Sequence, residues 1–363
     1  MKNFVAILLM FVAAFLPFLF APREKEEPIT ARAEVRRARI VVAGDVMQHD
    51  EQLWAARQAD SVTYDYEPMF RYVGDRFREA DIAMVNLETT LAENGPFTGY
   101  PAFRSPAALA EALKRAGVDV AALANNHCCD RGGRGIDSTI DILDKVGISH
   151  TGAYRDSVDY KENNVLYFEH CGIHLTMVNY TYGTNGIPTP AGRIVNRMDT
   201  VAMARDLALV PRDEVDFVVA YVHWGNEYER MPSREQRAQA EFMKRHGVDI
   251  IIGSHPHVVQ PAEVDSLGRV TIFSLGNFVS NQRTRYRDGG LVATIDVEVV
   301  DSLLQEEVFY SKKNISYKLE PVWVHLPEYS VMPREVGDTM QMTADSRRRY
   351  ERFMGDVREH LGI

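Results

Sequence analysis

The sequence has little cysteine, no excess of basic residues and no low-complexity tract. Three cysteines, two of them adjacent, cannot build the disulfide scaffold of a small secreted domain. The formal net charge is −10, from 41 Lys and Arg against 51 Asp and Glu. This acidic balance argues against sequence-independent binding to nucleic acid, which depends on clustered cations. With 45% hydrophobic and 25% charged residues, the composition is that of a globular protein and excludes disordered and collagen-like chains.

The cysteines Cys128, Cys129 and Cys171 are expected to be buried free thiols. The alternative is a disulfide between Cys171 and one of the adjacent pair, because an exported chain meets an oxidising compartment.

Export is indicated by the N-terminus. An apolar run occupies residues 4–21, and a charge cluster follows at 23–27. The run is intermediate in length between a signal-peptide core and the roughly 20 residues that cross a bilayer, so residues 1–33 form a signal peptide or an uncleaved membrane anchor. A small-x-small cleavage motif lies at 31–33. Either alternative places the body in the periplasm or at the extracytoplasmic face of the membrane.

From residue 38 onward, short apolar runs alternate with amphipathic helices. Continuous apolar runs are typical of strands buried on both faces between helical layers, and here they occupy residues 39–43, 82–86, 118–123, 215–222, 249–252 and 270–273. Helices are expected at 105–117, with Ser105 as N-cap and Pro106 at the first position, and at 135–147, 232–247 and 343–360. Segments 165–180 and 291–326 are predicted to be β-hairpins. The fold class is therefore α/β.

Polar side chains follow five of these strands at the point where each one ends. Open α/β sheets bind ligands at the carboxyl ends of their strands, so these side chains are expected to converge. They are Asp45 and His49, Asn86 and Glu88, Asn125 to His127, His223 to Glu227, and His255 and His257.

Carboxylate, amide and imidazole groups together form a ligand set suited to Mn, Fe or Zn. The chain has no Cys-x-x-Cys pair, which argues against a structural zinc site. The set can fill two metal shells, and two ions would activate a water molecule for hydrolysis. A histidine beside the ions could then act as general acid.

Each motif also has a purely structural interpretation. Asp45 could be a turn residue, Asn125 and Asn126 a tight turn, and Glu88 the start of a helix. Two imidazoles that flank Pro256 at a strand end are poorly explained by packing, which favours the metal hypothesis.

Six motifs in order resemble the CapA family, which is linked to capsular poly-γ-glutamate synthesis and belongs to the metallophosphatase-like fold superfamily. They are GDVMQHD (44–50), NLETTLA (86–92), NNHCCDRGGRG (125–135), YVHWGNEYERMPSREQ (221–236), IIGSHPHVVQPAE (251–263) and IFSLGNFVSNQ (272–282). The resemblance implies a four-layer α/β/β/α sandwich of the calcineurin-like phosphoesterase type.

The resemblance also implies roles for individual residues. Asp45 and His257 would bind the first metal ion, Glu88 would bridge the two ions, and His127 would donate a proton. The second ion would be bound by Asn126, His223 and His255. Ordinary metallophosphatases begin with Asp-x-His, whereas here the further candidate, His49, lies four positions after Asp45. A phosphatase also carries Asp where this chain has Glu88.

Several other residues are candidates for substrate binding. Arginines after two of the motifs could grip carboxylates or phosphates, or could form a solvated face. Trp224 could line the cleft or pack in the core. The candidates are Asn125, Arg131, Trp224, Glu227, Asn277, Arg283 and Arg285.

The leading hypothesis is an exported, metal-dependent hydrolase of poly-γ-glutamate capsule or cell-envelope metabolism. Its substrate would be an anionic polymer or a phosphorylated small molecule. The alternative is a non-catalytic accessory or polymer-export component of a membrane synthase complex. An ATP-driven ligase is disfavoured because the chain has no G-x-x-x-x-G-K-[ST] loop. The expected domains are a CapA-type domain at 38–326 and a C-terminal extension at 327–363.

Overall fold

The computed structural model describes residues 31–304 and 307–363. The apolar run at 4–21 lies outside them. Within the described part of the chain, no helix is both long enough and apolar enough to cross a bilayer.

The chain divides into two compact units. The first, Met1–Glu34 with Val300–Lys312, is described from residue 31 and contains end portions of three long strands, within which Ser311 donates a hydrogen bond to Asp301. The second, Val35–Val299 with Lys313–Ile363, contains every candidate site residue. All that follows concerns this second unit.

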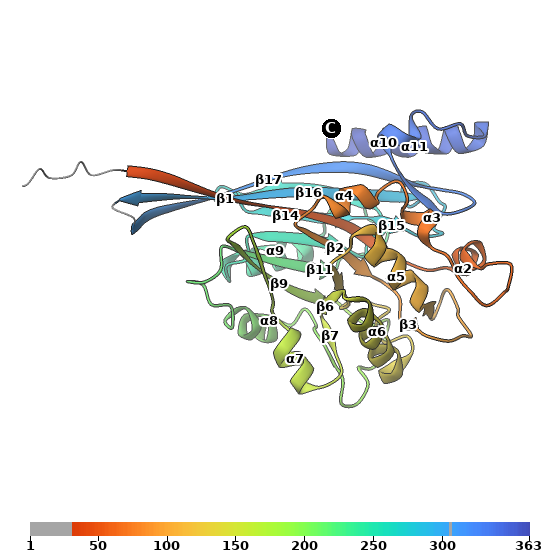
Figure 1. Ribbon diagram of the computed structural model, residues 1–363, viewed down its shortest axis with the longest axis horizontal. Coiled ribbons are helices and arrows are strands. Elements are labelled where there is room, and N and C mark those ends of the chain that lie inside the picture. The colour runs from red at the N-terminus through yellow and green to blue at the C-terminus, as the bar shows by residue number, and fades with distance from the viewer. Residues whose placement is uncertain (1–30, 305–306) are drawn as a thin grey trace, which may run out of the picture. The chain divides into compact units, whose positions relative to one another are not determined.

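Two sheets form the centre of the second unit (Figure 1). In spatial order, the first contains β18 (Ser330–Pro333), β17 (Glu307–His325), β16 (Gly289–Leu304), β1 (Ala31–Val46), β2 (Ile82–Leu87), β5 (Val120–Ala122) and β6 (Ser149–Thr151), with β15 (Asn277–Val279) also paired to β1. The second contains β13 (Val259–Val264), β14 (Val270–Leu275), β12 (Ile250–Ser254), β11 (Phe217–His223), β9 (Ile173–Thr181) and β8 (Leu166–His170). Two short pairs are β10 (Ile194–Val195) with β7 (Ala153–Tyr154), and β3 (Leu91–Ala92) with β4 (Ser105–Pro106).

Alternate residues of the strands explain the layers, because successive side chains point to opposite faces. In β1, Ile40 and Val42 belong to the core that also contains β9, β11 and β12 side chains, so the two sheets pack face to face. Val41 lies on the other face, in the core formed with helices α5 (Ala107–Ala116) and α6 (Gly132–Val146). Side chains of β11 such as Val218 pack with Met243 of helix α9 (Arg234–Arg245). The predicted α/β/β/α sandwich is therefore confirmed.

The described residues contain ten helices, and only α5, α6, α9 and α11 fall where the periodicity predicted helices. The ten are α2 (Asp50–Ala56), α3 (Glu67–Phe70), α4 (Gly74–Arg78), α5 (Ala107–Ala116), α6 (Gly132–Val146), α7 (Ser157–Asn163), α8 (Thr200–Leu207), α9 (Arg234–Arg245), α10 (Arg334–Gly337) and α11 (Ala344–Leu361). The predicted start of α5 is wrong: Pro106 is the N-cap, and Ser105 lies in β4 with its hydroxyl 2.6 Å from that of Thr89. Both predicted hairpins occur, since β8 pairs with β9 and β16 with β17.

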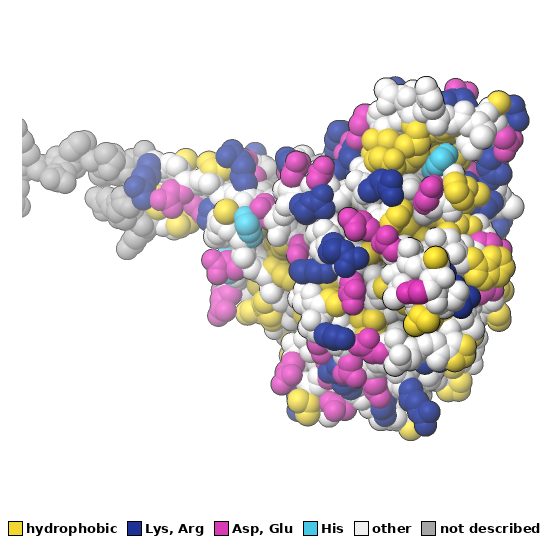
Figure 2. Space-filling view, turned by 45° about the vertical axis from the view of Figure 1, so that its right-hand side comes forward, with side chains coloured by type: hydrophobic (Ala, Val, Ile, Leu, Met, Phe, Trp, Pro, Cys, Tyr) yellow, Lys and Arg dark blue, Asp and Glu magenta, His cyan; other side chains and the backbone are white. Residues whose placement is uncertain are grey.

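The cysteines are free thiols. Cys128 and Cys129 are buried as predicted, but Cys171 is exposed, because it occupies the turn between β8 and β9 with a φ of 48°. Figure 2 shows cations and acids interspersed over the visible face, without a broad field of one sign there.

Candidate metal centre

Six side chains from both sheets meet at the carboxyl ends of their strands. Asp45 is near the end of β1, Glu88 follows β2, and Asn126 lies beyond β5. From the second sheet, His223 ends β11, and His255 and His257 follow β12. We call these six residues the ligand cluster. The sequence therefore placed them correctly at strand ends, although the strands belong to two facing sheets.

Short distances connect the members of the ligand cluster. His257 Nδ1 lies 3.0 Å from Asp45 Oδ2, and His223 Nε2 lies 3.0 Å from Asn126 Oδ1. Glu88 Oε1 is 3.7 Å from His257 Nε2 and 3.8 Å from His223 Nε2. Ligand atoms of Asp45, Glu88 and His257 all lie within 4.8 Å of one another, which is close enough for one cation to contact all three.

The electrostatics of the ligand cluster are unfavourable without a cation. Glu88 is fully buried, and burial, followed by the nearby charge of Asp45, raises the pKa of its carboxyl well above the usual value. Burial, followed by repulsion from His255, holds the pKa of His223 well below its usual value. Burial also lowers the pKa of His255 to about 3. These two imidazoles therefore supply no positive charge to the carboxyl groups of Asp45 and Glu88.

Two buried polar atoms of the ligand cluster lack a hydrogen-bond partner, which indicates a bound cation. Glu88 Oε1 and His255 Nδ1 are buried and have no hydrogen-bond partner. A buried unsatisfied polar atom is costly, and a charged one more so. Divalent cations bound here would satisfy these atoms and would neutralise the carboxylates. The ligand cluster fits such an ion and is a candidate divalent-metal site.

The segment that carries His255 and His257 has an unusual backbone. Their φ angles are 94° and 56°, a region that non-glycine residues seldom adopt. Gly253 precedes them because a Cβ there would lie 1.9 Å from the carbonyl oxygen of Phe273. Strained backbone of this kind is concentrated at functional sites, where surrounding structure holds it in place.

Asn86 lies at the centre of the ligand cluster. Its Nδ2 donates to Asp45 Oδ1 at 2.8 Å and to Glu88 Oε2 at 3.3 Å. It therefore orients both carboxylates. Asn86 was expected among the strand-end side chains but without a defined role, and its position two residues before Glu88 indicates a shared direction.

His127 is held by a buried carboxylate. Its Nδ1 lies 2.8 Å from Asp130 Oδ2, which also accepts a hydrogen bond from the backbone N–H of Phe103. The Phe103 ring packs edge-on against the imidazole at 4.6 Å. The other ring nitrogen, Nε2, lies 3.5 Å from Asn185 Nδ2.

Three of the predicted site residues make hydrogen-bond contacts with neighbouring residues. Asn277 Oδ1 is 3.1 Å from His257 Nδ1, and Asn125 donates to the Leu87 carbonyl oxygen at 2.8 Å. Both therefore position parts of the ligand cluster. His49 Nδ1 lies 3.2 Å from Gln52 Oε1 and accepts from the N–H of Asn281 at 3.3 Å.

Four candidates for substrate binding have structural partners instead. Trp224 is fully buried and donates to the Phe273 carbonyl oxygen, so the alternative of core packing is the correct one. Arg285 forms an ion pair with Asp356 in α11. Arg283 donates a hydrogen bond to the Val324 carbonyl oxygen, and Arg131 donates one to the Ala102 carbonyl oxygen.

Tyr182 is a site residue that the sequence analysis missed. Its ring centroid lies 4.4 Å from that of His255 and 6.2 Å from that of His223, and the residue is 42% exposed. It directly follows β9 and thus occupies a sixth strand end. Segment 165–180 was predicted only as a hairpin, so the end of its second strand was not considered with the others.

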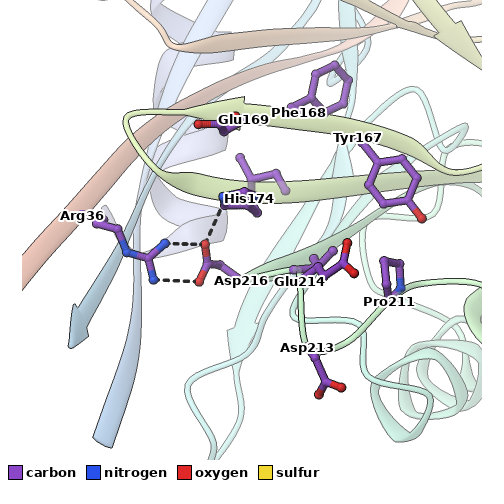
Figure 3. Close-up of a pocket in the computed structure, with 11 residues that line it drawn as sticks. Arg36, Tyr167, Phe168, Glu169, His174, Pro211, Asp213, Glu214 and Asp216 are labelled. Atoms are coloured by element: carbon purple, nitrogen blue, oxygen red, sulfur yellow. Dashed lines mark hydrogen bonds and ion pairs between the residues drawn. The ribbon is translucent and has the colours of Figure 1, made fainter. Parts of the chain in front are cut away.

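A separate cavity of about 610 Å³ lies at the opposite ends of β9 and β11 (Figure 3). Asp216 in its wall forms an ion pair with Arg36 at 2.8 Å and accepts from the backbone N–H of His174. Because Asp216 precedes β11 and His223 ends it, this cavity is distinct from the ligand cluster.

Comparison with known proteins identifies the family of this chain. Residues 39–282 match the family model described as "Bacterial capsule synthesis protein PGA_cap". The chain belongs to this family. It is 31% identical over 301 residues to the PGA biosynthesis protein CapA of Bacillus subtilis, covering 80% of this chain and 75% of that protein. It is 29% identical over 304 residues to the capsule biosynthesis protein CapA of Bacillus anthracis, covering 80% and 72%.

More distant matches were also found. One is a protein of Mycobacterium tuberculosis named "Probable polyglutamine synthesis accessory protein", 24% identical over 55% of this chain and 56% of that protein. Among solved structures, a phosphatase from Mycoplasma pneumoniae aligns with a TM-score of 0.42 at 14% identity, covering 78% of this chain and 95% of that one.

Proposed function

We propose that this PGA_cap protein is an exported, metal-dependent hydrolase of poly-γ-glutamate capsule or cell-envelope metabolism. One observation carries the proposal: buried carboxylates and buried imidazoles meet with Glu88 Oε1 and His255 Nδ1 left without partners. Buried networks of this kind are normally fully satisfied, so the arrangement favours a bound cation over a purely structural role.

The six members of the ligand cluster would hold the metal. A divalent cation there would polarise a substrate oxygen and lower the pKa of a bound water molecule, as in other metal-dependent hydrolases. Asn86 would keep Asp45 and Glu88 in position through the hydrogen bonds that it donates to both. Asn277 would hold His257 by accepting a hydrogen bond from its Nδ1.

His127 is proposed as the proton donor to the leaving group. Because its Nδ1 faces the acceptor Asp130 at 2.8 Å, Nδ1 carries a proton and Nε2 is the atom that exchanges a proton with substrate. The Asp130 carboxylate would stabilise the charged imidazolium before the transfer. The backbone N–H of Phe103 fixes that carboxylate in turn.

An anionic substrate is consistent with the family. The Bacillus subtilis relative is named for PGA biosynthesis and the Bacillus anthracis relative for capsule biosynthesis. We propose a γ-glutamyl polymer as the first substrate to test and a phosphorylated envelope compound as the second. Export would proceed through the apolar run at 4–21 and would place the metal centre at the extracytoplasmic face.

The test combines substrate screening with a site variant. Purified protein is assayed with γ-glutamyl peptides and phosphoesters in the presence of Mn²⁺, alongside His127→Gln. Turnover by the wild type that falls by about 10²-fold or more in the variant is expected for a general acid. Absence of turnover on both substrate classes, or equal rates for the two proteins, would count against a hydrolase with this acid.

The second candidate is an accessory protein that binds the polymer without cleaving it. It is favoured by the name of the Mycobacterium tuberculosis relative, which is that of an accessory protein. Polyglutamate binding without turnover, together with co-purification of a membrane ligase, would support this function. Cleavage of γ-glutamyl bonds by the purified protein would exclude it.

A further inference from the structure

Glu227 forms a second cluster with two of the metal-site histidines. Ligand atoms of Glu227, His255 and His257 all lie within 4.8 Å of one another. The other such group contains Asp45, Glu88 and His257, so His257 belongs to both. Glu227 is exposed, whereas the two histidines are only 3% and 2% exposed. The carboxylate therefore closes the group from the solvent side.

The loop that carries Glu227 is firmly anchored. The N–H of Trp224 donates to the Ser254 carbonyl oxygen at 3.1 Å, and that of Tyr228 donates to the Pro256 carbonyl oxygen at 2.7 Å. Both acceptors are in the segment that carries the histidines. Gly225 has a φ of 82° and passes close to the side chain of Gln236. These contacts hold the loop in register with His255 and His257.

The side chain beside Glu227 is also fixed. The Tyr228 ring centroid lies 6.3 Å from that of His257. The Tyr228 ring lies under the Arg287 guanidinium, whose carbon is 3.2 Å from the ring centroid. No Lys or Arg forms an ion pair with Glu227 among the residues that the structure describes. A role in a surface salt bridge is therefore not supported.

Both histidines offer nitrogen atoms to a cation. His257 Nδ1 lies 3.0 Å from Asp45 Oδ2 and 3.1 Å from Asn277 Oδ1. Both oxygens are acceptors, so Nδ1 carries the proton and Nε2 keeps its lone pair. His255 Nδ1 is buried without a partner. An unpartnered buried nitrogen on a histidine of this group is the independent sign of a ligand at this position.

We propose that Glu227 is a metal ligand, which binds a divalent cation together with His255 and His257 at the solvent side of the metal centre. The inference rests on the metal centre proposed above and adds a ligand to it. Among the residues that the structure describes, neither group of possible metal ligands contains His49, whose Nδ1 lies 3.2 Å from Gln52 Oε1.

The experiment compares metal binding by Glu227→Gln with binding by a matched control, Glu229→Gln. Glu229 is an exposed carboxylate two residues away on the same loop. The full-length protein is stripped with chelator and titrated calorimetrically with Mn²⁺, and the Co²⁺ form is followed by visible absorption. Neither readout depends on turnover. His257→Gln serves as the reference for loss of the shared ligand.

The expected result is that Glu227→Gln loses one Mn²⁺ per chain or binds it at least about tenfold more weakly, with a changed Co²⁺ spectrum, while Glu229→Gln matches the wild type. If Glu227→Gln binds Mn²⁺ as tightly as Glu229→Gln while His257→Gln loses it, the inference is wrong and the metal centre stands. If neither Glu227→Gln nor His257→Gln changes binding, both are wrong.

Discussion

Glu88 is the residue on which the metal centre most directly depends. Its raised pKa arises from burial and from the charge of Asp45. When the pKa of a carboxyl is higher in the folded than in the unfolded state, the free energy of unfolding falls as the pH rises above the unfolded-state pKa of about 4.5. Without metal, Glu88 therefore weakens the fold at neutral pH.

The first prediction concerns Glu88→Gln, which removes this charge at nearly constant volume. At pH 7.5 in chelator, the variant should melt at a higher temperature than the wild type. With Mn²⁺ the order of the two melting temperatures should reverse, because only the wild type keeps the Glu88 carboxylate that binds and is stabilised by the ion. A calorimetric melting series tests both conditions, with Glu229→Gln as control. A variant that is less stable than the wild type in chelator would contradict this interpretation.

His255 leads to a prediction about acidity. Burial, followed by the charge of His257, lowers its pKa from 6.5 to about 3. Between these values the unfolded chain takes up a proton that the folded protein excludes, so metal-free protein loses stability as the pH falls. The loss is at most about 1.4 kcal/mol per pH unit. His255→Gln should flatten this dependence in urea unfolding between pH 6.5 and 5, and an unchanged slope would exclude the effect.

At the scale of the elements, the strand ends were the most informative feature of the sequence. Continuous apolar runs identify buried strands, so the polar residues that end them were correctly placed for Asp45, His223 and His255. Asn86 was expected at a strand end but without a defined role, and Tyr182 was missed because it follows a segment predicted only as a hairpin. Positions at strand ends follow from local sequence, whereas the contacts between them do not.

The loop from Trp224 to Tyr228 gives the third prediction. Gly225→Ala would force a side chain into a left-handed φ of 82° and bring its Cβ within 2.6 Å of Gln236. We expect a stability loss of about 1–3 kcal/mol and weaker Mn²⁺ binding, because Glu227 moves with the loop. Gly268→Ala is the matched control, since its φ is 80° but nothing lies within 4 Å of the added Cβ. Equal Mn²⁺ affinities in the two variants would refute the positional role of the loop.

At the scale of the whole molecule, the two-sheet architecture could not be obtained from local patterns. Asp45 pairs with Asn86 on one side of β1 and with Asn277 on the other, although Asn277 is distant in sequence. Such pairing depends on contacts between segments far apart in the chain. The four layers were predicted from family resemblance rather than from periodicity. The domain boundaries at 38–326 and 327–363 stay predictions.

The fourth prediction follows from linkage between folding and metal binding. A ligand that binds only the folded state, present at 100 times its Kd, stabilises it by about 2.7 kcal/mol. For a chain of this size, that corresponds to a rise in Tm of about 4 °C. Thermal melts with Mn²⁺ and with chelator should differ accordingly. The same melts of a His255→Ala, His257→Ala double variant should coincide, and a metal response retained by that variant would place the ion elsewhere.

The most direct measurement is elemental analysis of the purified protein and of this double variant. The ligand cluster predicts at least one transition-metal ion per wild-type chain after gel filtration, and its loss when both imidazoles are removed. Circular dichroism of the two proteins would establish that the variant is folded. Wild-type protein without stoichiometric metal, or a folded double variant with the same metal content as the wild type, would contradict the metal centre on which the proposed function rests.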